Sequence, residues 1–280
     1  MGTTVATFLQ MKREGKKIAM LTCYDYSIAK ILDEAGVDAV LVGDSLGCVV
    51  LGYPDTLSVT MEDMIRHGSA VVRGCSRALV VIDMPFMSYQ ASVYDAVVNA
   101  GRLIKEARGH AVKLEGGAAV ADRIRAISEA GIPVQAHLGM TPQSVNALSG
   151  FKVQGKGEEA ARRLLADART VEEAGAFSVV LECVPPRLAA LISRKLTIPT
   201  IGIGAGEGCD GQILVAQDML GMYRDFTPRF VRRFGEVGAG MREAFSSYVN
   251  AVRTGTFPGP EHAFAKADCD EEILARLEQE

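Results

Sequence analysis

The chain has 280 residues, of which 48% are hydrophobic and 23% charged, so it can form one large domain or two small ones with a core that needs no disulfide or metal for stability. The formal net charge of −4 gives no indication of nucleic-acid binding. Six scattered cysteines without C-x-x-C spacing, and the lack of a signal peptide or of an apolar run long enough to span a membrane, predict a cytoplasmic protein with reduced thiols.

Short apolar runs alternate with amphipathic segments along most of the chain. The apolar runs are typical of strands buried on both faces of a parallel sheet and lie at 17–22, 38–43, 78–83, 110–115, 133–138, 177–183 and 199–204. The amphipathic segments predict helices at 4–15, 24–35, 60–74, 92–107, 118–130, 158–174, 187–195 and 230–251. Segment 213–222 is ambiguous and is expected to form the eighth strand, a helix, or part of each.

This alternation predicts an α/β fold, a (β/α)8 TIM barrel over residues 1–265 with an N-terminal helix and a C-terminal helical extension. An open doubly wound sheet is the alternative. The long irregular segment 139–157 is expected to be functional or mobile. The acidic tail 266–280 is expected to form a short helix or to be disordered.

Charged and polar side chains gather at the carboxyl ends of the predicted strands. They are Asp44 and Ser45 after the second strand, Asp83 on the third, Lys113 and Glu115 on the fourth, His137 on the fifth and Glu182 on the sixth. Because these strand ends form one rim of a barrel, we expect the side chains to converge there. A single acid at a strand end is as often a helix cap or an ion-pair partner, but four acids on four strand ends are harder to explain in that way.

Several carboxylates at one rim predict a shared cation, because close carboxylates repel one another. Oxygen ligands favour Mg²⁺, although manganese or cobalt could substitute. Lys113 lies two residues before Glu115 and shares its face of the strand, so its ammonium could hold a substrate carboxylate, to which Ser45 could donate a hydrogen bond. A 2-oxo acid chelating the metal would have its ketone polarised and its enolate stabilised. Burial of Glu182 in an apolar strand would make it a usable base.

Three other features admit more than one interpretation. His137 is equally well explained as a core histidine with its hydrogen bonds satisfied or as a donor to substrate. Residues 206–211 match G-x-G-x-x-G, but they lead into no clear helix, so close backbone packing or ligand contact is a better explanation than a dinucleotide site. Cys183 has no evident base beside it and is typical of a small core residue rather than a nucleophile.

An ordered set of motifs makes the sequence resemble the 3-methyl-2-oxobutanoate (ketopantoate) hydroxymethyltransferase family over nearly its whole length up to residue 255. The matching stretches are Thr-Cys-Tyr-Asp at 22–25, Val-Gly-Asp-Ser at 42–45, Asp-Met-Pro-Phe at 83–86, Val-Lys-Leu-Glu-Gly-Gly at 112–117, His-Leu-Gly-Met-Thr-Pro-Gln at 137–143, Phe-Lys-Val-Gln-Gly at 151–155, Leu-Glu at 181–182, Thr-Ile-Gly-Ile-Gly-Ala-Gly at 200–206 and Cys-Asp-Gly-Gln at 209–212. Ala136 stands where the family often has glycine. The tail from residue 266 is expected to extend beyond the usual end of the family.

The resemblance implies a Mg²⁺-dependent barrel enzyme of the phosphoenolpyruvate/pyruvate-binding type. Such enzymes transfer a hydroxymethyl group from 5,10-methylenetetrahydrofolate to 3-methyl-2-oxobutanoate through a Mg²⁺-stabilised enolate. The product is 2-dehydropantoate, in the first committed step of pantothenate biosynthesis. The resemblance also implies a homo-oligomer, commonly a decamer, whereas the charge and the lack of a long apolar run predict no nucleic-acid or membrane partner. Two alternatives stay open: a metal-dependent 2-oxo-acid C–C lyase of the same superfamily, and a non-catalytic homologue.

The resemblance also implies roles for individual residues. Asp44 and Asp83 bind the metal, and Glu115 joins them directly or through water. Ser45 and Lys113, together with Asp44 and Asp83, hold the oxo acid. Glu182 is the catalytic proton acceptor at C3 of the oxo acid.

Overall fold

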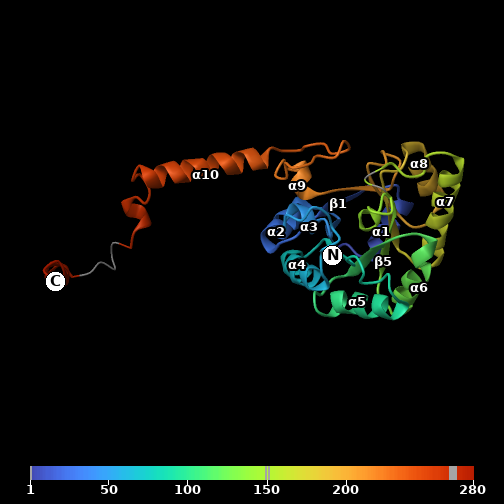
Figure 1. Ribbon diagram of the computed structural model, residues 1–280, viewed down its shortest axis with the longest axis horizontal. Coiled ribbons are helices and arrows are strands. Elements are labelled where there is room, and N and C mark those ends of the chain that lie inside the picture. Colours follow the sequence, from blue (N-terminus) through green and yellow to red (C-terminus); the bar gives the residue numbers. More distant parts are fainter. Residues whose placement is uncertain (1, 149, 151, 265–269) are drawn as a thin grey trace.

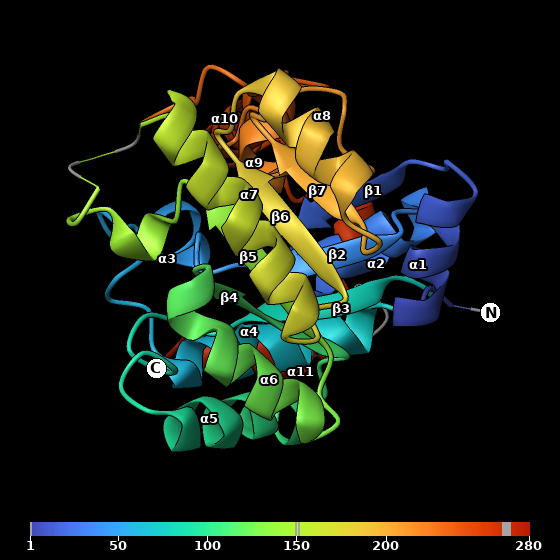
Figure 2. The ribbon, with the colours of Figure 1, turned by 90° about the vertical axis from the view of Figure 1, so that its right-hand side faces the viewer.

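Eight parallel strands form a closed barrel in chain order in the computed structural model, which describes residues 2–148, 150, 152–264 and 270–280. The strands are β1 (Ile18–Thr22), β2 (Ala39–Val42), β3 (Leu79–Asp83), β4 (Ala111–Glu115), β5 (Val134–Gly139), β6 (Ser178–Glu182), β7 (Thr200–Ile203) and β8 (Gly211–Leu214). Helices surround the strands (Figures 1 and 2). The predicted (β/α)8 barrel is therefore confirmed, and the open-sheet alternative is wrong.

The strands are apolar on both faces because the barrel has two cores. Alternate residues of each strand point into the barrel or outwards to the helices. Inward residues such as Leu41, Val81 and Ile201 form one buried cluster, and outward residues such as Val40 and Ile82 pack under the helices in another. Every residue of β2 and β3 is buried, which is why these strands appear in the sequence as continuous hydrophobic runs.

The helices of the barrel wall follow the expected alternation. They are α2 (Tyr26–Ala35), α4 (Met61–Gly74), α5 (Val93–Lys105), α6 (Ala121–Glu129), α7 (Glu158–Glu173) and α8 (Pro186–Lys195), with the short elements α3 (Leu46–Val49), η1 (Ala118–Val120), η2 (Pro142–Ser144) and α9 (Ala216–Met219) at strand ends. Helix α1 (Val5–Arg13) places the buried Phe8 edge-on against Phe177, with ring centroids 5.8 Å apart. None of the described helices combines the length and hydropathy needed to cross a bilayer.

The eighth unit agrees with one of the expected outcomes, a strand followed by a helix. Segment 213–222 is divided between the end of β8 and helix α9, and the strand begins earlier, at Gly211. A Cβ on Gly211 would lie 2.5 Å from the carbonyl oxygen of Ile18. The close approach of β8 to β1 thus requires a glycine, a residue that in the sequence is more typical of a turn.

The last long helix, α10 (Val237–Arg253), begins seven residues later than predicted and has no buried residue. It projects from the barrel instead of packing on it (Figure 1). The outer face of β1 and β8 consequently forms part of an open groove of about 890 Å³. After the turn η3 (Pro260–His262), the tail contains helix α11 (Glu271–Leu277), and residues 266–269 of the predicted tail lie outside the described residues.

Candidate active site

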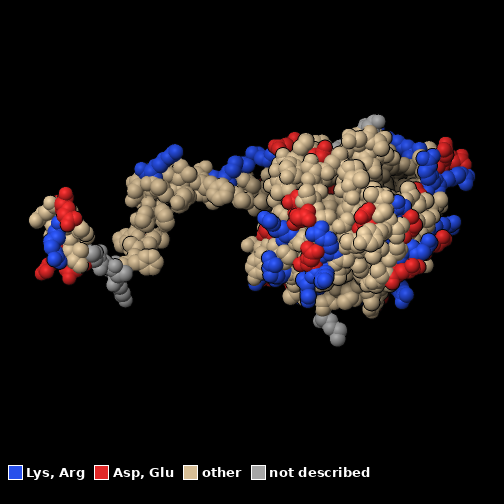
Figure 3. Space-filling model, turned by 60° about the horizontal axis from the view of Figure 1, so that its bottom comes forward, with Lys and Arg blue, Asp and Glu red and all other residues tan. Residues whose placement is uncertain are grey.

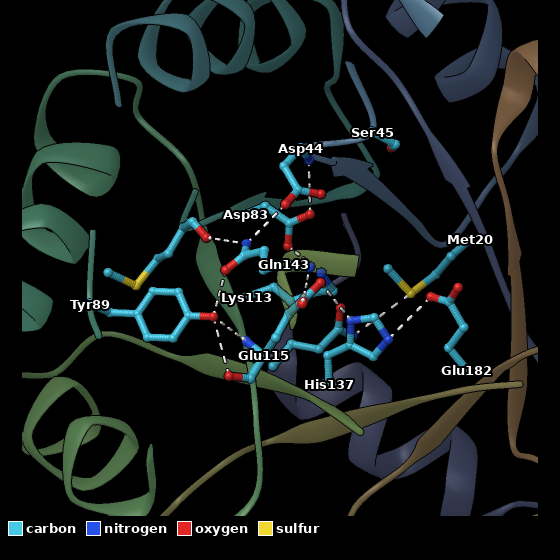
Figure 4. A network of polar contacts seen from close by, with 12 residues as sticks. Met20, Asp44, Ser45, Asp83, Tyr89, Lys113, Glu115, His137, Gln143 and Glu182 are labelled. Atoms are coloured by element: carbon cyan, nitrogen blue, oxygen red, sulfur yellow. Dashed lines mark hydrogen bonds and ion pairs between the residues drawn. The ribbon is translucent and has the colours of Figure 1, made fainter. Parts of the chain in front are cut away.

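The charged side chains predicted at the strand ends converge at one rim of the barrel (Figure 4). Parallel pairing places Asp83 beside Lys113, Glu115 beside His137, and Gly139 beside Glu182. Most of the group is buried, with 2% exposure at Asp83, 4% at Lys113 and 3% at His137. The side chain of Glu182 is more accessible, at 15%. Burial of this many charged groups indicates that they compensate one another or bind a ligand.

Asp83 is the centre of the first half of the site. Its Oδ1 forms an ion pair of 2.5 Å with the Nζ of Lys113, and its Oδ2 accepts a hydrogen bond of 3.1 Å from the backbone N–H of Asp44. Gly43 leaves room beside Asp44, because a Cβ at that position would lie 2.8 Å from the Oγ of Ser45 and 3.5 Å from the Oδ2 of Asp83.

Ser45 lies at the edge of this group. Its hydroxyl lies 2.9 Å from the hydroxyl of Tyr24. In Figure 4 its side chain is set apart from the carboxylates. The structure thus pairs Ser45 with Tyr24, a residue to which the sequence had assigned no role.

His137 lies between two carboxylates in the second half of the site. Its Nδ1 is 3.3 Å from the Oε1 of Glu115 and its Nε2 is 3.2 Å from the Oε2 of Glu182. These are ion-pair distances, but neither contact has hydrogen-bond geometry. Burial and the Lys113 ammonium lower the pKa of His137, yet the two carboxylates outweigh them and raise it to about 9. The imidazole is therefore a cation at neutral pH that lies between the two carboxylates and offsets part of their charge.

The site has more negative than positive charge. Burial, followed by the charges of Asp83 and Glu115, raises the pKa of Asp44 to about 8. Burial also raises the pKa of Asp83 despite its ion pair with Lys113. The pKa of Glu115 is lowered because His137 and Lys113 outweigh its burial. A hard divalent cation beside Asp44 and Asp83 would offset this excess of negative charge, so the donor set fits Mg²⁺.

The carboxylates do not form a ready-made cage. Within the described ranges, no three His, Cys, Asp or Glu side chains are grouped closely enough to hold a metal ion by themselves. A cation bound by Asp44 and Asp83 would therefore complete its coordination with water or with oxygens of a substrate. Mg²⁺ commonly binds in this way, with few protein carboxylates and several waters.

Sequence reasoning missed two uncharged members of the site, Tyr89 and Gln143. The side-chain amide of Gln143 donates to the Oδ2 of Asp44 at 2.9 Å, and its backbone N–H donates to the Oε2 of Glu115 at 3.0 Å. Tyr89 donates to the amide oxygen of Gln143 at 2.7 Å. Gln143 ends one of the family motifs, which was the only available signal, because a neutral amide adds nothing to a charge pattern.

The glycine motif at 206–211 serves packing. A Cβ on Gly206 would lie 2.7 Å from the Cβ of Pro186, and one on Gly208 would lie 2.5 Å from the Cβ of Ala190. The motif therefore lies against α8, and it leads into strand β8 rather than into a helix. Of the two interpretations favoured for this motif, backbone packing and ligand contact, these distances support backbone packing.

A closed (β/α)8 barrel with a buried cluster of acids, a lysine and a histidine at the carboxyl ends of its strands is the architecture of a barrel enzyme. The chain belongs to the ketopantoate hydroxymethyltransferase family, whose model matches residues 2–260. A 3-methyl-2-oxobutanoate hydroxymethyltransferase from Enterococcus faecalis is 64% identical to it over 99% of this chain and 100% of that protein. The family resemblance is thus confirmed. The tail from residue 266 lies beyond the end of the family model at residue 260, whereas the match to the Enterococcus faecalis relative includes nearly all of the chain.

Solved structures with the same fold are far more distant in sequence. A 2,3-dimethylmalate lyase of the PEP mutase/isocitrate lyase superfamily matches with a TM-score of 0.61 at 18% identity, over 99% of this chain and 92% of that one. Phosphonopyruvate hydrolase in complex with oxalate and Mg²⁺ matches with a TM-score of 0.60 at 12% identity, over 99% and 95%. These likenesses support the barrel fold.

Proposed function

We propose that the protein transfers a hydroxymethyl group from 5,10-methylenetetrahydrofolate to 3-methyl-2-oxobutanoate, which gives 2-dehydropantoate for pantothenate synthesis. The observation that carries this proposal is the placement of Glu182 at the same rim as the Asp83–Lys113 ion pair. An oxo acid held by its carboxylate at Lys113 would present its neighbouring carbons to the other residues of that rim. The 64% identity to the Enterococcus faecalis enzyme supports the choice of substrates.

In the proposed binding mode, Asp44 and Asp83 hold Mg²⁺, and Glu115 contributes directly or through water. When bound, Mg²⁺ supplies Lewis acidity toward the ketone of the oxo acid. Lys113 binds the substrate carboxylate as a point charge, and Ser45 donates a hydrogen bond to the same group. Asp83 keeps the ammonium of Lys113 in place through their ion pair.

Glu182 is the proposed acceptor of the C3 proton. It is the most accessible of the rim carboxylates, and its Oε2 faces the Nε2 of His137 at 3.2 Å. His137 thus orients Glu182 from one ring nitrogen and Glu115 from the other, a role that neither sequence interpretation included.

A turnover assay tests this function directly. The purified protein with Mg²⁺ and 3-methyl-2-oxobutanoate is expected to form 2-dehydropantoate only when 5,10-methylenetetrahydrofolate is present. Cleavage of a branched 2-hydroxy diacid without folate would favour the lyase alternative instead. Calorimetry with Mg²⁺ and the oxo acid distinguishes either enzyme, the hydroxymethyltransferase or the lyase, from a non-catalytic homologue. For a non-catalytic homologue we expect no binding.

We also propose that the protein is a homo-oligomer, with the decamer of the family as the expected form. The support lies in α10, whose exposed apolar side chains follow helical spacing and form one stripe. They are Val237, Met241, Phe245, Tyr248, Val249 and Val252. Figure 3 shows the projecting helix mostly covered by uncharged side chains. An apolar stripe of this length is typical of a surface covered by protein.

A second copy of the chain is the proposed occupant of the open groove on the outer face of β1 and β8. This is the face on which the helix after the eighth strand packs in a (β/α)8 barrel. The groove is lined by apolar side chains that include Leu21, Val37 and Leu214. A copy of α10 from another chain would bury its own stripe and close this barrel at the same time.

Phe245→Asp tests this assembly, because Phe245 is 61% exposed at the middle of the stripe. We expect the variant to have a lower mass than the wild type by light scattering, since a buried charge opposes association. Asn250→Asp, five residues on and about 140° around the helix, is the matched control and should keep the wild-type mass. Equal masses for wild type and Phe245→Asp would contradict the assignment of α10 to the interface.

A further inference from the structure

Gln143 makes an unusual number of contacts for a residue of the 139–157 segment. Its amide nitrogen donates to the Oδ2 of Asp44 and to the carbonyl oxygen of Met84, both at 2.9 Å. Its amide oxygen accepts from the hydroxyl of Tyr89 at 2.7 Å and from the side-chain nitrogen of Gln90 at 3.1 Å. Both amide hydrogens and both acceptor positions of Gln143 are therefore used.

These partners determine which way the amide faces. The carbonyl of Met84 can only accept a hydrogen bond, so the nitrogen of Gln143 must lie towards Met84 and towards Asp44 on the same side. Tyr89 reinforces this orientation from the other side. It is 1% exposed, and its hydroxyl donates to the amide oxygen of Gln143 at 2.7 Å.

The same residue contacts two of the three candidate metal carboxylates. Its side chain binds the Oδ2 of Asp44, and its backbone N–H binds the Oε2 of Glu115 at 3.0 Å. Among the described residues, no hydrogen bond is donated to the Oδ1 of Asp44, which leaves that oxygen for a cation. Figure 4 shows Gln143 between Asp44 and the tyrosine that orients its amide.

We propose that Gln143, locked in orientation by Tyr89, is a positioning residue that holds Asp44 and Glu115 ready for a divalent cation. The proposal rests on the cation site of the proposed function. Hydrogen bonds to ligating carboxylates typically change metal affinity by about 10- to 100-fold. Because Gln143 lies on the segment that follows β5, it also couples the position of that segment to the carboxylates of β2 and β4.

A double-mutant cycle on Mn²⁺ affinity, measured by electron paramagnetic resonance without substrate, tests the proposal. Gln143→Ala is expected to weaken Mn²⁺ binding by about 10- to 100-fold. Tyr89→Phe removes a hydroxyl that donates to Gln143 at 2.7 Å and accepts from the backbone N–H of Glu115 at 3.1 Å, and it is expected to weaken Mn²⁺ binding by about 3- to 10-fold. The double variant should bind Mn²⁺ no more weakly than Gln143→Ala, because Tyr89 acts through the amide.

Gln135 offers a matched control, since it is a fully buried glutamine of β5 that donates to the Oγ of Ser178 inside the barrel at 2.8 Å. Gln135→Leu is expected to alter thermal stability and to leave Mn²⁺ affinity unchanged. The proposal would be overturned if folded Tyr89→Phe bound Mn²⁺ with wild-type affinity. It would also be overturned if Tyr89→Phe weakened Mn²⁺ binding by the same factor in the wild type and in Gln143→Ala. If the wild type itself binds no Mn²⁺, the cation site of the proposed function fails, and this inference with it.

Discussion

Glu182→Gln is expected to abolish the exchange of the C3 proton of 3-methyl-2-oxobutanoate into heavy water. General-base catalysis contributes about 10²- to 10⁴-fold, and the amide keeps the shape of the side chain but cannot accept a proton. Oxo-acid binding should be retained within about 3-fold, because the Lys113 ammonium that would hold the carboxylate pairs with Asp83 and not with Glu182. Proton exchange followed by NMR, with calorimetry of oxo-acid binding, measures the two effects separately.

Glu173→Gln makes the same chemical change at an exposed position on α7. It should leave both exchange and binding at the wild-type level. Exchange that persists in Glu182→Gln at the wild-type rate would remove Glu182 from the role of base, whatever the overall turnover of that variant.

Asp44→Asn is expected to have opposite effects on metal binding and on stability. The variant should lose more than about 100-fold in Mg²⁺ affinity, because a proposed ligand loses its charge, which exceeds the usual effect of an outer hydrogen bond. Without divalent ions the same variant should be more stable than the wild type at pH 8, by several kcal/mol. The asparagine oxygen can still accept the hydrogen bond from Gln143.

The higher stability expected of Asp44→Asn without divalent ions follows from the raised pKa of Asp44. Burial and the charges of Asp83 and Glu115 raise this pKa from 3.8 to about 8 in the folded protein, so ionisation is easier in the unfolded chain. The penalty on the wild type is absent below about pH 4, grows as the pH rises, and is complete above about pH 8. The stability difference between Asp44→Asn and the wild type should therefore widen across this interval.

Urea unfolding at several pH values with a chelator measures this difference, and Mg²⁺ calorimetry measures the affinity. Asp122→Asn, at an acid whose side chain is 55% exposed on the surface, is the control and should change neither quantity. A wild-type protein that is more stable than Asp44→Asn at pH 8 without divalent ions would show that the rim tolerates the extra charge, and would contradict the need for a cation.

The barrel and most of its rim could be predicted because both depend on local patterns. A strand buried on both faces is a short apolar run wherever it occurs, and an acid that ends such a run lies at the carboxyl edge of a parallel sheet. Asp83 and Glu182 each end their strand, and Lys113 and Glu115 share a face two residues apart. No information about distant residues was needed to place them at one rim.

Only the tertiary structure decided which groups pair across the rim. Gln143 contacts Asp44 across 99 positions of the chain, and His137 lies between two carboxylates from neighbouring strands. Neither pairing leaves a periodic signal, because a hydrogen bond depends on register and on where a loop returns. The same holds for α10, whose apolar stripe is identical whether it covers its own barrel or another. The amino-acid order thus determined the elements and the chemistry at their ends, whereas the path of the chain between them decided the contacts.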